Sequence, residues 1–193
     1  MSQLIFNRRT IRKFKQKRIS KAILMDCIDA ARLAPSAANL QPLEYILVTK
    51  KLDRVFQYTK WAGYLEDGSP KEGEKPTAYI IIISNSKINK EAKYDVGLAV
   101  GNIITTALEK DIASCIIGSL NRHELVRCFK IPKKYIIELV VALGYPEQTS
   151  KKEALKKDVK YWLDKDGVLH VPKRKLTDIA HEEIFAKDKA MRD

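Results

Sequence analysis

The sequence is short of the residues that build metal sites and disulfides. Its 193 residues include three cysteines and three histidines. Cys27, Cys115 and Cys128 form no CxxC pair and leave one thiol over, which is typical of buried cysteines in a reducing compartment. The histidines lie too far apart along the chain for a local ligand motif, so we expect no metal site.

Long apolar runs are also lacking. No stretch approaches the roughly 18 uninterrupted apolar residues of a membrane span. The first seven residues, MSQLIFN, lack the charged-then-apolar order of a secretory signal. There is no internal repeat or Gly/Ser linker, and a 45% hydrophobic content suffices for one core. We therefore expect a single cytoplasmic domain over residues 1–193, with no membrane segment.

Acidic residues are absent from the first 21 positions, which hold eight Lys or Arg and so account for +8 of the net charge of +12. The rest of the chain mixes both signs, as a solvated surface does. A basic patch can bind nucleic acid, but Phe14 is the lone aromatic residue within the basic run that could stack on a base. A small phosphorylated ligand fits this segment at least as well, and we expect no nucleic-acid partner.

Apolar periodicity predicts an alternation of helices and strands. The expected helices are 21–33, 52–59, 88–110, 121–129 and 176–189, and the expected strands are 44–49, 78–84, 112–117 and 136–143. Ser20 is a candidate N-cap, and Pro35 ends the first long helix. Residues 60–76 are rich in Gly, Pro and charge and predict a possible lid loop. Residues 147–170 are expected to be an extended connection to the C-terminal helix. Because the alternation lacks a strict βαβ rhythm, we expect an α+β fold with a mixed central β-sheet surrounded by helices.

The segment Arg8-Arg9-Thr10-Ile11-Arg12 is a candidate phosphate site. Planar guanidinium groups match phosphate oxygens in a bidentate manner, and a terminal phosphate carries nearly two charges at neutral pH. A solvated basic strand that binds nothing specific is an equally good interpretation of this motif alone.

Three further segments have a functional and a structural interpretation. Ser, Asn and Gln in the Pro-bounded loop 35–42 can contact the polar edge of a heterocycle, or can simply form a helix stop and turn. Gly118, just past a strand, can let a backbone amide approach a ligand, or can make an ordinary turn. Gly97 and Gly101 lie four apart on one helix face, and we favour close helix packing at a subunit interface over contact with a flat cofactor.

The order of these segments resembles the FMN-dependent nitroreductase family over nearly the whole chain. The specific motifs are RRTIRKF at 8–14 and APSAANLQP at 34–42, and the supporting segments are 94–99, 114–118, 142–146 and a late Lys-Arg pair. The resemblance implies a nitroreductase-like homodimer with a helical interface and FMN bound between the subunits. It also implies an NAD(P)H-dependent oxidoreductase. Such an enzyme moves hydride from NADH or NADPH through FMN N5 to an electron-poor acceptor, such as a nitroaromatic or quinone, by a ping-pong mechanism.

The same resemblance assigns cofactor contacts. Arg8, Arg9 and Thr10 would contact the phosphate or ribityl chain, and Arg12 would lie near the N1/C2 carbonyl edge of the flavin. The loop contacts from the partner subunit would be Pro35, Ser36, Asn39 and Gln41. The backbone contacts near N5 would be Ile117 and Gly118, and the late phosphate contacts would be Lys173 and Arg174. Because the chemistry lies on the flavin, no catalytic side chain is assigned.

The sequence departs from the family pattern in three places. Leu43 stands where relatives often have Trp, and Thr10 replaces the commoner Ser. Residues 151–170 form a longer connection than the shortest relatives have, which leaves Tyr161 and Trp162 without an assigned place. Trp61 and Tyr64 are candidates for the wall of an acceptor pocket, or are exposed loop aromatics.

Alternative functions share the cofactor site. One is a specialised flavin relative, of the dehalogenase, flavin-fragmenting or oxidase type, which would differ in its substrate walls. The other is a non-catalytic FMN-binding module.

Overall fold

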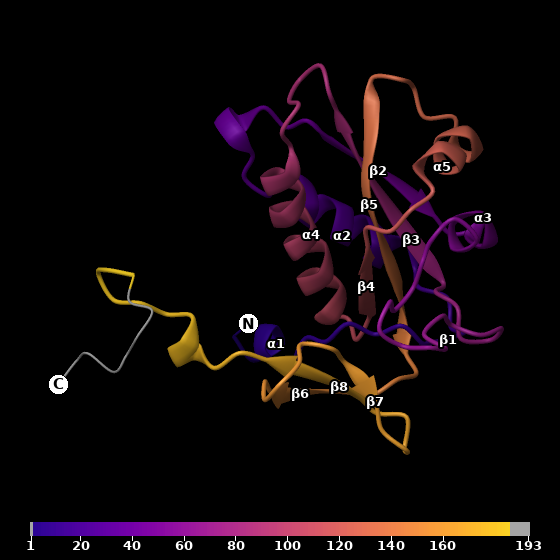
Figure 1. Ribbon diagram of the computed structural model, residues 1–193. Helices are drawn as coiled ribbons and strands as arrows, with labels where there is room; N and C mark the ends of the chain where they lie inside the picture. Colours follow the sequence, from indigo (N-terminus) through magenta and orange to yellow (C-terminus); the bar gives the residue numbers. More distant parts are fainter. Residues whose placement is uncertain (1, 186–193) are drawn as a thin grey trace.

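In the computed structural model of the protein, which describes residues 2–185, helices cover both faces of one central sheet (Figure 1). The elements are α1 (Ser2–Asn7), β1 (Phe14–Lys15), α2 (Lys21–Arg32), β2 (Leu43–Val48), α3 (Leu52–Phe56), β3 (Ala78–Asn85), α4 (Lys93–Leu108), β4 (Ala113–Ile117), α5 (Arg122–Phe129) and β5 (Tyr135–Pro146). A smaller sheet follows, made of β6 (Ser150–Ala154), β7 (Trp162–Leu163) and β8 (Leu169–Lys173). Among the described residues, no helix is both long and apolar enough to cross a bilayer.

β5 organises the central sheet because it pairs on both sides. One side pairs with β3, which in turn pairs with β2, and the other side pairs with β4 and then with β1. The α+β class is confirmed. The strand pairs of this sheet are all antiparallel within residues 2–185, whereas the sequence predicts a mixed sheet, and its one parallel contact is the isolated bridge Thr10–Ser114.

The uninterrupted apolar run of β3 is compatible with this antiparallel pairing. Every residue of β3 is buried, a pattern typical of parallel strands. Here an antiparallel strand has the same pattern because both faces of the sheet are covered. Ile80 and Ile82 pack toward α2 and α4, while Tyr79 and Ile81 pack in the second core cluster with residues of α3 and α5.

The predicted helix after Ser20 is confirmed as α2. The Ser20 hydroxyl accepts a hydrogen bond from the Ile23 N–H at 3.4 Å, which satisfies a free donor of the first turn. Leu24, Cys27 and Ala31 form its buried stripe. The other predicted helices before residue 130 are also present, although α4 begins at Lys93 rather than near residue 88.

The C-terminal predictions are wrong. Over residues 176–185 the predicted helix is replaced by one 3₁₀ turn, Leu176–Asp178, and the remaining predicted positions, 186–189, lie outside the described residues. Leu176 and Ile179 are 74% and 51% exposed, so within residues 2–185 this segment has no surface against which a helix could pack. Helical propensity alone rarely holds so short a helix in water. The connection 147–170 is not merely extended, because it contributes β6, β7 and the start of β8.

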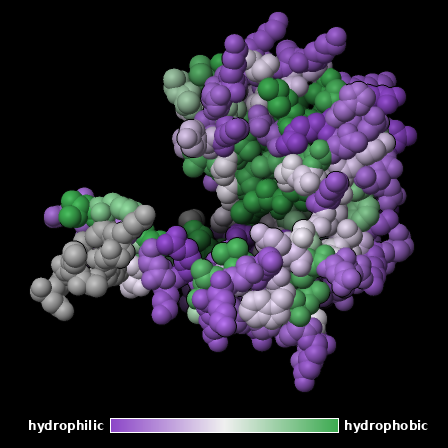
Figure 2. Space-filling model, in the orientation of Figure 1, coloured by the Kyte–Doolittle hydropathy of each residue, from purple (hydrophilic) through white to green (hydrophobic). Residues whose placement is uncertain are grey.

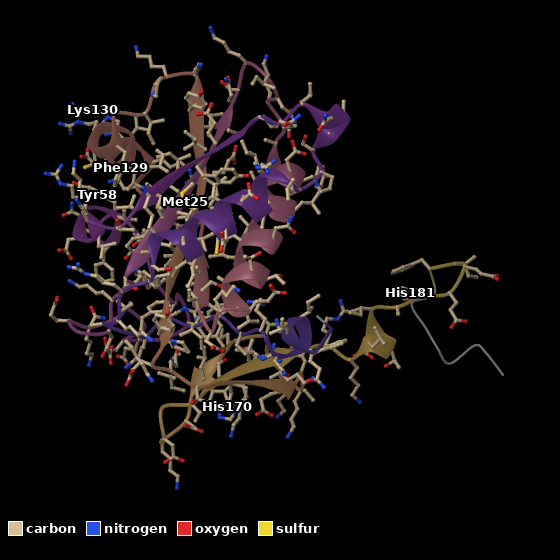
Figure 3. The ribbon with its side chains drawn as sticks, turned by 180° about the vertical axis from the view of Figure 1, so that it is seen from behind. Met25, Tyr58, Phe129, Lys130, His170 and His181 are labelled. Carbon is tan, nitrogen blue, oxygen red and sulfur yellow. The ribbon has the colours of Figure 1, made fainter. Side chains whose placement is uncertain are left out.

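His170 joins the three strands of the small sheet. Its Nδ1 lies 2.7 Å from Glu153 Oε1 of β6, and its Nε2 lies 2.9 Å from Asp164 Oδ2, just after β7. The Trp162 ring stacks on the imidazole with centroids 5.1 Å apart. Figure 3 shows His170 on the small sheet, well away from Met25 on α2. The hydrogen bonds to Asp164 and then to Glu153 raise the pKa of His170.

We predict that the small sheet loosens as the pH rises. Protonated His170 donates to both carboxylates, whereas neutral imidazole can donate only once. The stabilisation is therefore complete below the ordinary histidine pKa of about 6.5 and is lost as the pH rises through the raised pKa. NMR titration of the His170 ring should give a pKa above the ordinary value, and Asp164→Asn should lower it. A wild-type pKa at or below the ordinary value would contradict this interpretation.

Candidate functional site

The cationic N-terminal segment is fixed to one end of β4. The Ile11 N–H donates to the Ser114 carbonyl at 3.1 Å, beside the bridge between Thr10 and Ser114. Three residues later, Phe14 pairs with Pro146 of β5. The segment is therefore not a free solvated strand, because main-chain bonds hold it against the sheet on both sides of Arg12.

A pocket of about 340 Å³ lies beside this segment. Its lining comes from the cationic segment, the end of α4, the start of β4 and the chain just after β5; the polar members are Asn7, Arg8, Arg9, Asp111, Ser114, Gln148, Thr149 and Ser150. The Ser150 hydroxyl is buried and has no hydrogen-bond partner within residues 2–185. A buried polar group left unpaired costs about 1–3 kcal/mol, so this hydroxyl is suited to a polar ligand.

Arg9 lines the pocket, and main-chain carbonyls hold its guanidinium. Arg9 donates to the main-chain carbonyls of Arg8 at 2.5 Å and Phe6 at 2.6 Å, and so folds back on the end of α1. Burial, and secondarily the charge of Arg8, lower the pKa of Arg9. Two neighbouring cations repel each other, and an anion placed between them would relieve that repulsion.

Arg12 lies at the junction between this segment and the small sheet. Its main-chain N–H donates to Gln148 Oε1 at 3.2 Å. Its guanidinium carbon lies 4.7 Å from the centre of the Tyr161 ring, and its Nε is buried without a hydrogen-bond partner in the described part of the chain. Arg12 makes no ion pair within residues 2–185. Its positive charge is therefore not neutralised by a described carboxylate.

The outer edge of β4 begins beside the cationic segment at Ser114 and continues to Gly118. β4 pairs with β5 on one side, and on the other side its contact is the bridge at Ser114. From Ser114 to Gly118 the edge runs about 13 Å at the usual rise of a strand. Ile116 is 45% exposed and Gly118 is also exposed, whereas the Ile117 side chain is buried. A Cβ at Gly118 would meet nothing within 4 Å, so a flat molecule has room to approach the main chain there.

The loop 35–42 is a built structure rather than a plain turn. Ala38, Asn39 and Gln41 have φ values of 47°, 54° and 49°, a left-handed conformation that is unfavourable for residues with a Cβ. The Ser36 hydroxyl accepts the Gln41 N–H at 3.0 Å. Asn39 and Gln41 are exposed, so the strained loop presents their amide groups to solvent. A smaller pocket of about 150 Å³ lies between this loop, α2 and α4.

Asp95 of α4 secures that loop. Its side chain is 3% exposed, and its Oδ1 accepts the Ala37 N–H at 3.0 Å. The Asn89 amide approaches the other oxygen at 3.5 Å. Sequence reasoning placed Asp95 in the supporting segment 94–99 but assigned it no role, although a lone carboxylate beside Val96 near the start of an apolar helix was a usable signal.

The two halves of the predicted site lie at opposite ends of α4 (Figure 1). The loop is held by Asp95 in the first turn, whereas Leu108 at the last turn lines the cationic pocket. Thirteen residues of helix separate them by about 20 Å. Within one subunit, the structure therefore brings Arg8, Arg9, Thr10 and Arg12 to β4 but leaves the loop residues Pro35, Ser36, Asn39 and Gln41 apart from them.

Lys173 and Arg174 also lie away from the pocket. β6 and β8 run parallel, with Ser150 opposite Leu169 and Ala154 opposite Lys173, so the pocket and Lys173 are at opposite ends of these strands. Arg174 donates instead to the Asp178 carbonyl at 2.7 Å. Gln148 and Ser150, which do reach the pocket, follow β5 in a segment that carries no motif, and sequence reasoning missed them.

One face of α4 is apolar and uncovered. Tyr94 and Leu98 are 86% and 48% exposed, and a Cβ added to Gly97 or Gly101 would meet nothing within 4 Å. Figure 2 shows hydrophobic side chains gathered over the middle of this side of the molecule, over α4. The two glycines, which the sequence assigns to close packing, pack against no element of their own subunit among the described residues.

The structure combines an α+β fold with a pocket beside the cationic segment at an open strand edge, and comparison with known proteins gives the family. The model of the Nitroreductase family matches residues 5–145. A predicted NADH dehydrogenase/NAD(P)H nitroreductase from Archaeoglobus fulgidus is 28% identical over 158 residues, which cover 75% of this chain and 84% of the relative.

Two solved structures are similar to the chain. An FMN-dependent nitroreductase from Clostridium difficile R20291 has a TM-score of 0.65 at 26% identity and covers 81% of this chain and 92% of its own. A predicted nitroreductase in complex with FMN from Desulfovibrio desulfuricans has a TM-score of 0.71 at 20% identity, with 96% and 97% covered, and shows the shared fold. The chain belongs to the nitroreductase family and is an oxidoreductase.

We predict that Asp95→Ala releases the loop 35–42. The change removes the carboxylate that accepts the Ala37 N–H, and the loss of a hydrogen bond to a charged group costs about 1.5–3 kcal/mol of unfolding free energy. Amide hydrogen exchange should become faster at residues 37–41, while the protection of β3 is kept. Asp95→Asn is the matched control because it keeps an acceptor oxygen. Equal exchange in Asp95→Ala and wild type would show that Asp95 does not secure the loop.

Proposed function

We propose that the protein is a cytoplasmic, homodimeric FMN-dependent oxidoreductase that uses NADH or NADPH to reduce an electron-poor acceptor, such as a nitroaromatic or quinone. The observation that carries the proposal is the cationic pocket at the end of β4. Arg8 and Arg9 line it, Ser150 offers an unpaired hydroxyl, and Arg12 beside it has no described counter-charge. A terminal phosphate fits such a group of donors.

FMN fits the residues that surround the edge of β4. Its phosphate would be held by Arg8, Arg9 and the Ser150 hydroxyl, with Thr10 beside them. The open edge from Ser114 to Gly118 would offer main-chain groups to the flavin ring, with Ile117 and Gly118 at its far end. Arg12 would supply positive charge at the polar edge of the ring. When bound, FMN supplies the redox chemistry by accepting hydride from the nicotinamide and passing it to the acceptor in a ping-pong sequence.

The protein's own residues supply orientation, charge and walls. The loop 60–76 begins where the Lys60 N–H donates to the Ser119 carbonyl at 3.0 Å, next to Gly118. It ends where the Phe14 N–H donates to the Glu74 carbonyl at 2.9 Å. The loop is thus anchored at both ends of the β4 edge, which favours a lid or wall role for it. We assign no catalytic side chain, because Arg12 and the loop act by position and by excluding water.

The separation of the two half-sites within one subunit supports the proposed homodimer. Two copies of α4 that pack antiparallel about a two-fold axis would place the loop of one subunit beside the cationic pocket of the other. The apolar face of α4 with Tyr94, Gly97 and Leu98 suits that contact. The proposal therefore has Pro35, Ser36, Asn39 and Gln41 reach the flavin from the partner. Lys173 and Arg174 lie away from the pocket of their own subunit. The proposal keeps them as phosphate contacts that form only in the assembled dimer.

The first test is the colour and reduction of the protein. Purified wild type should be yellow or become so with added FMN, with absorbance near about 450 nm. Anaerobic NADH or NADPH should bleach that band, because the nicotinamide reduces the flavin directly. A protein that takes up no FMN would overturn the proposal. A flavin that neither nicotinamide reduces would instead favour the non-catalytic FMN-binding module.

The second test mixes two variants, each changed in a different half of the site. Arg8→Ala and Asn39→Ala should each weaken FMN binding, because each damages one half of every site. In a mixed dimer of the two, one site carries both changes and the other carries neither. Random pairing after co-refolding should therefore restore wild-type affinity at about a quarter of all sites, as measured by FMN fluorescence titration. No restoration in the mixture would place Arg8 and Asn39 in the same subunit's site.

A further inference from the structure

Two segments without a role in the family pattern meet at Arg12. One is the loop 60–76, which carries Tyr64, and the other is the link between β6 and β7, which ends at Tyr161. The rings of Tyr64 and Tyr161 lie with their centroids 5.1 Å apart at an angle of 54°. Tyr161 in turn covers the Arg12 guanidinium at 4.7 Å. These residues come from three distant parts of the chain, so the contact is made by the tertiary fold.

Arg12 is an unusual partner for this contact because it is otherwise uncommitted. Its Nε is buried without a hydrogen-bond partner, and no carboxylate pairs with it, within residues 2–185. The nearby Cys115 thiol does not supply the missing charge. Burial, opposed by Arg12, raises the pKa of Cys115 to about 11, so the thiol stays neutral at physiological pH. A flexible side chain with these properties needs another contact to hold its direction, and the Tyr161 ring provides it.

The segment around Tyr161 is itself firmly held. Trp162, the next residue, stacks on His170, and His170 bonds to Glu153 and Asp164. On the other side, the loop with Tyr64 is tied near its end by the ion pair between Lys13 and Glu74 at 2.9 Å. Lys13 is the neighbour of Arg12. The same loop therefore bonds to the cationic segment next to Arg12, and through Tyr64 it also contacts the Tyr161 ring that covers the Arg12 side chain.

We propose that Tyr161, supported by Tyr64, is a positioning residue that fixes the Arg12 guanidinium at the flavin's polar edge. This rests on the proposed function, because Arg12 acts on FMN only if FMN binds beside β4. Tyr161 covers the guanidinium and leaves its terminal NH₂ groups, which make no described hydrogen bond, for a ligand. A fixed cation at this edge favours the reduced, anionic flavin more than the neutral oxidised flavin. Tyr161 therefore tunes the redox potential of the site without touching substrate.

The first measurement needs no cofactor. In the apoprotein, the Arg12 Nε–H should give a protected NMR signal that is shifted by the ring current of Tyr161. Tyr161→Phe keeps a ring and should keep that shift, whereas Tyr161→Leu should abolish it. A wild-type signal without the shift would overturn the contact itself, whatever the protein binds.

The second measurement compares FMN affinity in the two redox states. Tyr161→Leu removes the cation–π contact that holds Arg12 in place. It should therefore weaken the binding of reduced FMN by roughly threefold to tenfold, and that of oxidised FMN by less. The midpoint potential should accordingly become more negative. Tyr161→Phe should remain close to wild type. In an Arg12→Ala background, Tyr161→Leu should have no further effect on the potential, because the group it positions is gone.

Trp162→Leu is the matched control. It removes the neighbouring aromatic residue, which stacks on His170 and not on Arg12, so it should destabilise the small sheet but leave the midpoint potential unchanged. A potential that shifts equally in both Leu variants would overturn the proposal in favour of a general structural effect. Wild type that binds FMN, with Tyr161→Leu unchanged in potential, would also overturn it. Wild type that binds no FMN would instead defeat the proposed function, while the apoprotein signal would still test the contact.

Discussion

Phe14 packs directly on Gly144 of β5, so closely that a Cβ at residue 144 would lie 2.7 Å from the Phe14 ring. Phe14 is fully buried, and β1 pairs with β5 just beyond β4. This contact determines the path of the cationic segment, because the chain that runs from α1 to Phe14 must pass the start of β4. Arg8 and Arg9 then reach the pocket, and Arg12 reaches the small sheet. Any bulkier residue at 144 would push away the strand on which the candidate phosphate site depends.

Several energetically unfavourable features lie at the candidate site of the subunit. Neighbouring arginines repel each other, the Ser150 hydroxyl and Arg12 Nε are buried without described partners, and three residues of the loop 35–42 hold left-handed conformations. Strain and unpaired groups of this kind persist where the surrounding structure enforces them, and they concentrate at functional sites. Asp95 and the β5 pairing provide that enforcement. In the proposed dimer, a bound anion and the partner subunit would offset these costs.

Sequence reasoning succeeded where the signal was local. Ser20 and Pro35 marked the ends of α2, and the apolar runs marked β3 and β5, because capping and burial leave periodic patterns in the chain. It failed at the C-terminal part, where β7 has two residues and Lys-rich β6 lacks a β-strand composition. In the candidate site, the arginine motif and the Pro-bounded loop were found from sequence. Gln148, Ser150 and Tyr161 were not, because only the tertiary fold brings them to Arg8 and Arg12.

The contacts of Tyr161 give a structural role to the connection 151–170, which is longer than in the shortest relatives. The loop 60–76 is anchored beside Gly118 at one end and beside Lys13 at the other, so its two ends flank the open edge of β4. Tyr64 joins that loop to Tyr161, and Tyr161 joins both to Arg12. In the proposed site, a displacement of the loop by a bulky acceptor would therefore be transmitted to Arg12. The proposed wall of the acceptor site and the proposed flavin-facing charge of Arg12 are thus parts of one packed unit, so a change in one should alter the other.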